Sequence, residues 1–81
     1  MADQELDCNG LRCPMPVLRA AKALRAMQPG QVLAVTATDK VAIKDFQTFC
    51  REAGHELLAM QPAGDHAAGP VTLFTIRRGN G

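Results

Sequence analysis

In the segment CPMP, residues 13–16, a cysteine is followed directly by one proline and, two residues later, by a second. Its thiol is the strongest candidate for chemistry in the chain. Proline fits the first position of a helix, where its fixed φ is suitable and its missing N–H is not needed. If Pro14 is that first residue, Cys13 is the N-cap and lies at the positive end of the helix. This location lowers the pKa of a thiol and keeps it at the surface. The pattern therefore predicts that Cys13 is an exposed nucleophile.

The residues around Cys13 are expected to fix the position of its sulfur more than its charge. Pro14 and Pro16 remove two N–H donors from the first helical turn, so only a moderate lowering of the thiol pKa is expected. Such a thiol both attacks and leaves readily, which suits a group that takes something up and passes it on. Gly10 allows the turn that exposes the thiol, and Arg12 supplies a positive charge beside it.

Cys8 and Cys50 are the other two thiols, and the odd total excludes a disulfide framework that uses every cysteine. Cys50 lies on the apolar side of a predicted helix and is expected to be a small buried hydrophobe. Cys8 has two interpretations. Either a turn at residues 9–10 folds it back toward Cys13 as a resolving thiol, or it is a half-buried residue at the end of a strand.

Two further constellations involve the histidines. The first two cysteines, together with Cys50 and His55, loosely resemble the paired ligands of a structural zinc site, but the spacing is too wide and the predicted positions lie apart. His55 or His66 would act as a base for Cys13 in a thiol hydrolase, although no pattern brings either one near it. We therefore expect no metal ion, and a hydrolase would also need an oxyanion hole that is not evident.

Hydrophobic periodicity and turn residues divide the chain into six predicted elements. In chain order we expect a strand at 4–7, a helix at 14–27, a strand at 31–38, a helix from the N-cap Asp39 to Gly54, and strands at 55–61 and 71–78. Apolar residues recur at helical spacing in both helices: Val17, Ala20, Ala21, Leu24 and Met27, then Ala42, Phe46, Phe49, Cys50 and Ala53. Residues 62–70 are expected to form a long mobile loop.

The order βαβαββ predicts an α/β two-layer sandwich, with a mixed four-stranded sheet and both helices on one face. Residues 1–81 are expected to form a single domain, because the chain is too short for a second core. The other sheet face is left uncovered, and the last strand is apolar on both sides, with Val71 and Leu73 on one and Phe74 and Ile76 on the other. That face is either a contact surface or the ordinary scatter of exposed apolar residues.

The formal charge is +1, from nine Lys and Arg against eight Asp and Glu, and only three residues are aromatic. This composition argues against a nucleic-acid-binding protein, which needs a basic surface and stacking residues. No apolar run approaches the roughly 18 residues of a membrane span, and the acidic start MADQELD does not resemble a signal peptide. We therefore expect a cytoplasmic protein with no membrane contact and no direct contact with nucleic acid.

The stretches LDCNGLRCPMPVLRAAKAL, MQPGQVLAVTATD and FCREAGHELL together resemble the TusA/SirA-like sulfur-carrier proteins over essentially the whole chain. The resemblance rests on the CPxP signature at residues 13–16 and on the spacing of four further landmarks: Gly10, Pro29-Gly30, Asp39 and His55-Glu56. Two residues depart from the pattern. Lys40 stands where the family often has proline, which alters how the second helix begins, and Cys8 occupies a variable position.

The resemblance implies that Cys13 carries sulfane sulfur as a persulfide, with Pro14 and Pro16 as its rigid support and no other cofactor. It implies a cysteine desulfurase or a rhodanese-type sulfur donor, and a DsrE/TusD-like or DsrC/TusE-like acceptor. The resemblance also implies the pathways that receive the sulfur: 2-thiouridine formation in tRNA, molybdenum cofactor synthesis or dissimilatory sulfur oxidation. We expect a monomeric sulfurtransferase. The alternative is a noncatalytic regulatory module that binds a partner through the open sheet face.

Overall fold

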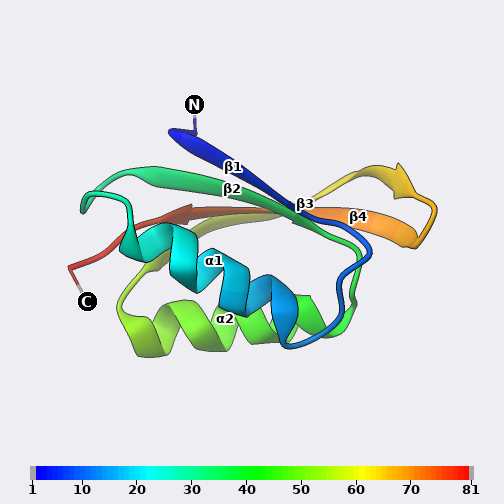
Figure 1. Cartoon of the computed structure of the whole chain (residues 1–81), viewed down its shortest axis with the longest axis horizontal. Helices are drawn as coiled ribbons and strands as arrows, with labels where there is room; N and C mark the ends of the chain where they lie inside the picture. The colour runs from blue at the N-terminus through cyan, green and yellow to red at the C-terminus, as the bar shows by residue number, and fades with distance from the viewer. Residues whose placement is uncertain (1, 81) are drawn as a thin grey trace.

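Six elements follow one another in the computed structural model, which describes residues 2–80. They are β1 (Gln4–Cys8), α1 (Met15–Arg25), β2 (Val32–Ala37), α2 (Val41–Ala53), β3 (Glu56–His66) and β4 (Gly69–Arg77). The strands form one sheet in the order β1-β2-β4-β3, with β1 and β2 parallel and the other neighbours antiparallel. Both helices lie on one face of this sheet (Figure 1). The predicted two-layer α/β sandwich with βαβαββ order is therefore confirmed.

The core lies between the sheet and the helices, on the helix faces that periodicity predicted. Leu24 of α1 and Phe46 of α2 are fully buried, as are Leu33 of β2 and Phe74 of β4. The ring centroids of Phe46 and Phe74 lie 4.5 Å apart, which joins α2 to the middle of the sheet. Each such side chain contributes about 1.5–3 kcal/mol when it is fully buried. These contacts hold α2 firmly against the sheet.

Helix α1 begins at Met15, one residue later than expected. Pro14 is its N-cap, and the Pro14 carbonyl accepts a hydrogen bond from the Leu18 N–H at 3.1 Å. Pro16 lies in the first turn, where its missing N–H is not needed, and its ring is buried. Cys13 therefore precedes the N-cap and does not form it, because the cap position falls on Pro14.

The two helices end differently. Helix α1 ends at Arg25, two residues before the expected boundary, although Met27 is still buried in the core. Helix α2 stops at Gly54, which has φ +80° and donates its N–H to the Cys50 carbonyl. The left-handed conformation favours glycine, so the predicted stop is confirmed. Neither helix in the described part of the chain is long and apolar enough to cross a membrane.

Residues 62–70, predicted to be a long loop, instead extend β3 and β4 into a hairpin. The turn is reduced to residues 67–68, and strand pairing continues on both sides of it. The register shifts between Pro62 and Asp65, and Gly64 lies within this irregularity with φ +94°. Proline and glycine weaken the sequence signal of a strand, but β3 is an edge strand, where a missing N–H and a bulge are tolerated. The loop prediction was wrong for this reason.

The uncovered face of the sheet is largely small and polar. A shallow hollow on it is lined by Glu5, Leu6, Asp7, Ala34, Thr36 and Leu73, whereas Phe74 and Ile76 are buried in the core. Among residues 2–80, the exposed large apolar side chains are Met15, Leu18, Val41, Ile43, Leu58 and Met60. Four of these belong to the first turns of α1 and α2, which begin at the same end of the molecule (Figure 1). Most of this exposed apolar surface therefore lies at the end of the molecule where the helices begin.

Candidate functional site

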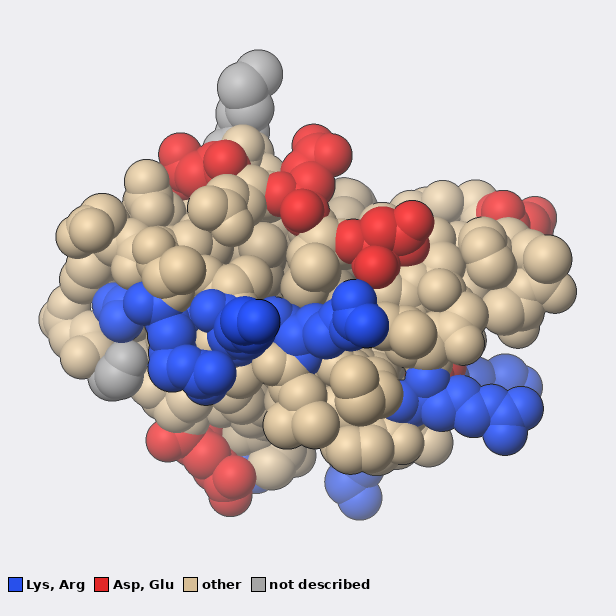
Figure 2. All heavy atoms as spheres, in the orientation of Figure 1, with Lys and Arg blue, Asp and Glu red and all other residues tan. Residues whose placement is uncertain are grey.

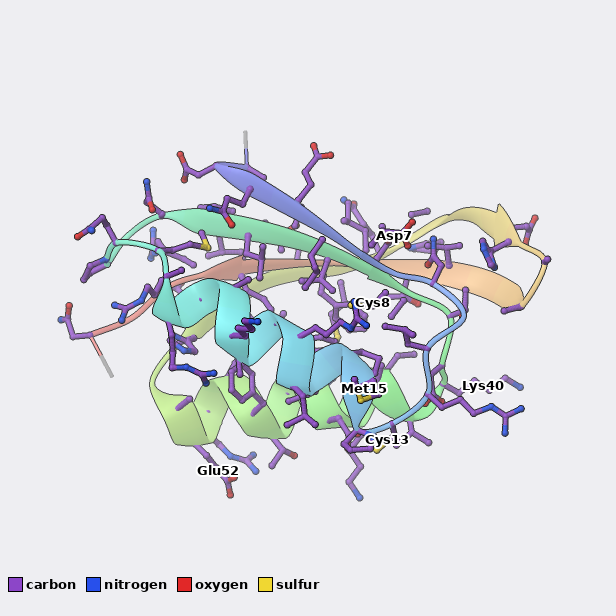
Figure 3. The ribbon with its side chains drawn as sticks, viewed as in Figure 1. Asp7, Cys8, Cys13, Met15, Lys40 and Glu52 are labelled. Atoms are coloured by element: carbon purple, nitrogen blue, oxygen red, sulfur yellow. The ribbon has the colours of Figure 1, made fainter. Side chains whose placement is uncertain are left out.

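Cys13 lies at the surface, between β1 and α1, at the end of the molecule where both helices begin (Figure 3). A turn precedes it, in which the Leu11 N–H donates to the Cys8 carbonyl at 3.1 Å. Gly10 has φ +83°, a left-handed conformation that favours glycine, and its N–H donates to the Thr38 hydroxyl at 2.9 Å. This bond ties the thiol segment to the chain just after β2.

Asp39 joins the thiol segment to the start of α2. Its Oδ2 accepts the N–H of Cys13 at 2.6 Å, and its Oδ1 accepts the N–H of Val41 at 3.0 Å. These two bonds, that of Cys13 first, lower the pKa of Asp39 because they favour the ionised carboxylate, and the charge of Arg12 acts in the same direction. The N-cap position itself falls on Lys40. The prediction of Asp39 as the N-cap is therefore wrong by one residue, although its side chain accepts the N–H of Val41, the first residue of α2.

The sulfur of Cys13 contacts a carboxylate and not a helix end. Its thiol donates a hydrogen bond to Asp45 of α2, with 2.9 Å between Sγ and Oδ2. This bond raises the pKa of Cys13 above its ordinary value of 9.0, and desolvation and the charges of Asp45 and Asp39 act in the same direction. The predicted lowering of the pKa is therefore wrong. Cys13 lies outside the N-cap, the prolines that follow it lack N–H groups, and the carboxylates dominate.

A groove between α1 and α2 opens at this thiol. It is lined by Cys13, Pro14, Val17, Lys44, Asp45, Thr48, Phe49 and Glu52. Glu52 marks its far end, near the last residue of α2 (Figure 3). Pro14, Val17 and Phe49 give the groove apolar surface, and most of its charged side chains are acidic. The groove therefore places apolar surface and mainly acidic charge beside the thiol.

Arg12 does not face the sulfur. It lines a separate hollow together with Gly10, Leu11, Thr38, Asp39, Lys40 and Ala68. Its charge lowers the pKa of Asp39 and is not among the causes that shift Cys13. Arg12 therefore acts on the carboxylate that holds the Cys13 backbone, and not on the thiol directly.

Cys8 and Cys50 are buried, whereas Cys13 is exposed, and all three thiols are free. Burial raises the pKa of both inner thiols, that of Cys50 to about 11. Cys8 ends β1 inside the core, while Cys13 lies beyond it at the start of α1 (Figure 3). The structure thus favours the interpretation of Cys8 as a strand-end residue and does not bring it to Cys13.

Neither histidine lines the groove. The Nδ1 of His55 accepts the Gly79 N–H at 2.9 Å, and its ring packs against Phe49 with 5.5 Å between centroids. The Nδ1 of His66 accepts the Ala68 N–H at 3.0 Å in the hairpin turn. Both rings serve as backbone hydrogen-bond acceptors in this structure. Among the described residues, no group of three or more His, Cys, Asp and Glu side chains is placed to hold a metal ion.

The charged side chains are segregated although the net charge is only +1. Figure 2 shows Lys and Arg gathered in a band along α1, with Asp and Glu above them along β1. Arg19, Lys22 and Arg25 of α1 are exposed, and the first two border a shallow hollow beside Leu6. A basic flank therefore runs along α1, away from the thiol.

Asp45 is the site residue that sequence reasoning missed. It lies 32 positions from Cys13 along the chain. In the sequence it is one polar position beside the apolar stripe of a helix, with nothing to distinguish it from Glu52 of the same helix. Only the packing of α1 beside α2 brings its carboxylate to the sulfur.

Comparison with known proteins agrees with the fold and with the earlier resemblance. The family model of sulfurtransferase TusA matches residues 4–77. The sulfur carrier protein TusA of Allochromatium vinosum is 53% identical over 62 residues, 76% of this chain and 82% of that protein. YrkI of Bacillus subtilis is 40% identical over 78 residues, 96% and 97% of the two chains. The crystal structure of a SirA-like protein from Desulfitobacterium hafniense matches with a TM-score of 0.72 at 26% identity, covering 95% of this chain and 99% of that one. This chain therefore belongs to the TusA family of sulfurtransferases.

Proposed function

We propose that this protein carries sulfane sulfur as a persulfide on Cys13 and passes it to the thiol of a partner protein. The family provides the sulfur-carrier role, since its members include a named sulfur carrier protein. The contrast among the three cysteines supports the choice of residue. Cys13 is exposed and opens onto a groove, whereas Cys8 and Cys50 are buried in the core.

The transfer needs only thiol–persulfide exchange. During loading, the Cys13 thiolate attacks the outer sulfur of a donor persulfide, an S–S bond forms on Cys13, and the donor leaves as a thiolate. During delivery, a partner thiolate attacks the outer sulfur of the Cys13 persulfide, that S–S bond breaks, and the released Cys13 thiolate takes up a proton. The S–S bond is about 2.05 Å long, so the transferable sulfur projects beyond the Cys13 sulfur toward the partner.

The surface around Cys13 suits the docking of such partners. Met15 and Leu18 of α1, and Val41 and Ile43 of α2, expose apolar surface at the helix starts. We infer a cysteine desulfurase or a rhodanese-type donor, and a DsrE/TusD-like or DsrC/TusE-like acceptor. The outlet of the sulfur is then tRNA thiolation, molybdenum cofactor synthesis or sulfur oxidation.

Mass spectrometry tests this function on the purified chain. After incubation with a desulfurase and cysteine, or with a rhodanese and thiosulfate, we expect an adduct of about 32 Da on Cys13. Dithiothreitol should remove the adduct, and the Cys13→Ser variant should lack it. Cys8→Ala is the matched control and should keep it. A wild-type chain that gains no adduct, or an adduct that persists in Cys13→Ser, would exclude Cys13 as the carrier residue.

A further inference from the structure

Asp45 touches the sulfur of Cys13, and the transfer steps described above assign it no task. Its Oδ2 lies 2.9 Å from Sγ. The next residue of α2, Phe46, is fully buried and packs against Phe74 of β4. The core therefore holds this turn of α2 in place, and the carboxylate is presented to the thiol by a rigid element.

The same contact has opposite effects on the empty and the loaded carrier. An empty Cys13 donates its thiol proton to Asp45, which is a favourable hydrogen bond to a charged acceptor. A persulfide is more acidic than a thiol, so a loaded Cys13 is anionic near neutral pH and has no proton to donate. Its outer sulfur remains within about 5 Å of the carboxylate oxygen. Two negative charges so close disfavour the loaded state.

We propose that Asp45 is a positioning residue that favours the empty thiol of Cys13 over its persulfide and so biases the carrier toward delivering sulfur. The inference rests on the proposed function. In this exchange, a Cys13 thiol and a donor persulfide anion react to give a Cys13 persulfide anion and a donor thiol. One sulfur atom moves, one S–S bond breaks while another forms, the Cys13 proton passes to the donor, and no electrons are gained or lost overall.

The other charged groups around the sulfur do not reverse this bias. Asp39 adds a second carboxylate, bonded to the Cys13 N–H. Lys44 brings a positive charge to the same groove from the position before Asp45. The pKa of the thiol is nevertheless raised, with the Asp45 hydrogen bond as the largest cause. Arg12 acts on Asp39 and not on the thiol.

The first test measures the thiol without any sulfur donor. The rate of Cys13 alkylation by iodoacetamide is followed against pH in wild type, Asp45→Asn and Glu52→Gln. We expect the Asp45→Asn profile to move to lower pH, with alkylation near pH 8 about fivefold faster, the factor for removing one adjacent unit charge in water. Glu52 lines the same groove without touching the sulfur, so the alkylation profile of Glu52→Gln should match that of wild type. Coincident profiles for wild type and Asp45→Asn would overturn the inference.

The second test measures the loading equilibrium. Each protein is equilibrated with glutathione persulfide and glutathione at one fixed ratio, and the ratio of loaded to empty Cys13 is read by mass spectrometry. Asp45→Asn should raise this ratio about fivefold, and Asp45→Glu should restore the wild-type value. Circular dichroism confirms that each variant is folded. A carrier that loads equally with and without the Asp45 charge would overturn this inference alone, whereas a wild-type chain that takes up no sulfur would overturn the carrier function itself.

Discussion

Two regions of this molecule hold thiols, and both raise the thiol pKa for different reasons. In the core, Cys8 and Cys50 lose their contact with water, and burial alone raises the pKa of Cys50 to about 11. At the helix starts, Cys13 stays exposed, and its hydrogen bond to Asp45 raises its pKa. Burial also blocks every reagent, whereas a hydrogen bond at the surface leaves the sulfur open to a partner. Accessibility, and not acidity, separates the proposed carrier thiol from the two buried thiols.

The two regions also differ in what holds them together. The core depends on packed apolar side chains such as Phe46 and Phe74. The thiol segment depends on polar bonds to residues distant in sequence, among them those of Asp39 and Thr38. Substitutions in the core should therefore lower the free energy of unfolding and leave the chemistry of Cys13 unchanged. Substitutions at Cys13 should abolish its chemistry and leave the free energy of unfolding unchanged.

The largest expected difference is in chemical accessibility. In the native protein, iodoacetamide should modify Cys13 about 100-fold faster than Cys8 or Cys50, because the buried thiols react only when the fold opens. In strong denaturant the three rates should converge. Peptide mapping of a timed alkylation series gives all three rates. If Cys8 or Cys50 were labelled as fast as Cys13 in the native protein, the predicted contrast between buried and exposed thiols would be wrong.

The next difference is in stability. Cys50→Ser places a hydroxyl in the apolar core and should lower the free energy of unfolding by about 1–3 kcal/mol, while its Cys13 persulfide yield stays at the wild-type level. Cys13→Ser should leave the unfolding free energy essentially unchanged, because the side chain is exposed. Urea denaturation of both variants gives the two values. Equal losses in the two variants would contradict the predicted contrast between the core and the thiol segment.

The smallest difference concerns Asp39. Asp39→Asn should lower the midpoint of thermal unfolding by a few degrees at neutral pH, because it weakens two charge-assisted backbone bonds. The folded pKa of Asp39 is depressed, so its stabilisation is present above the unfolded pKa near 3.8 and is lost as pH falls through the folded value.

A pH series of thermal melts checks this prediction. The difference in the midpoint of thermal unfolding between wild type and Asp39→Asn should disappear as the pH is lowered. Asp65→Asn, which alters an exposed carboxylate of the β3–β4 hairpin, is the control and should melt like wild type throughout. A gap that is constant with pH would assign the effect of Asp39 to packing and not to its charge.

The elements with strong hydrophobic periodicity were predictable, and the hairpin was not. The stripe of α2 through Ala42, Phe46 and Cys50 is buried as its spacing indicated. The segment 62–66 carries no such pattern, since Pro62, Ala63 and Gly64 are poor strand formers. It becomes a strand because β4 supplies pairing partners and the bulge absorbs the irregular residues. Such a strand is decided by its neighbour and not by its own sequence.

The sequence by itself determined the layer architecture and the buried helix faces, and it singled out Cys13 as the candidate reactive thiol. These depend on local patterns: apolar spacing, turn residues and a cysteine set between a glycine turn and two prolines. Only the tertiary structure decided the state of that thiol. Asp39 and Asp45 lie 26 and 32 positions from Cys13, and the packing of α2 and of the segment before it beside the start of α1 brings both carboxylates to it. Electrostatic effects follow distance in space, so no local pattern could reveal the sign of this pKa shift.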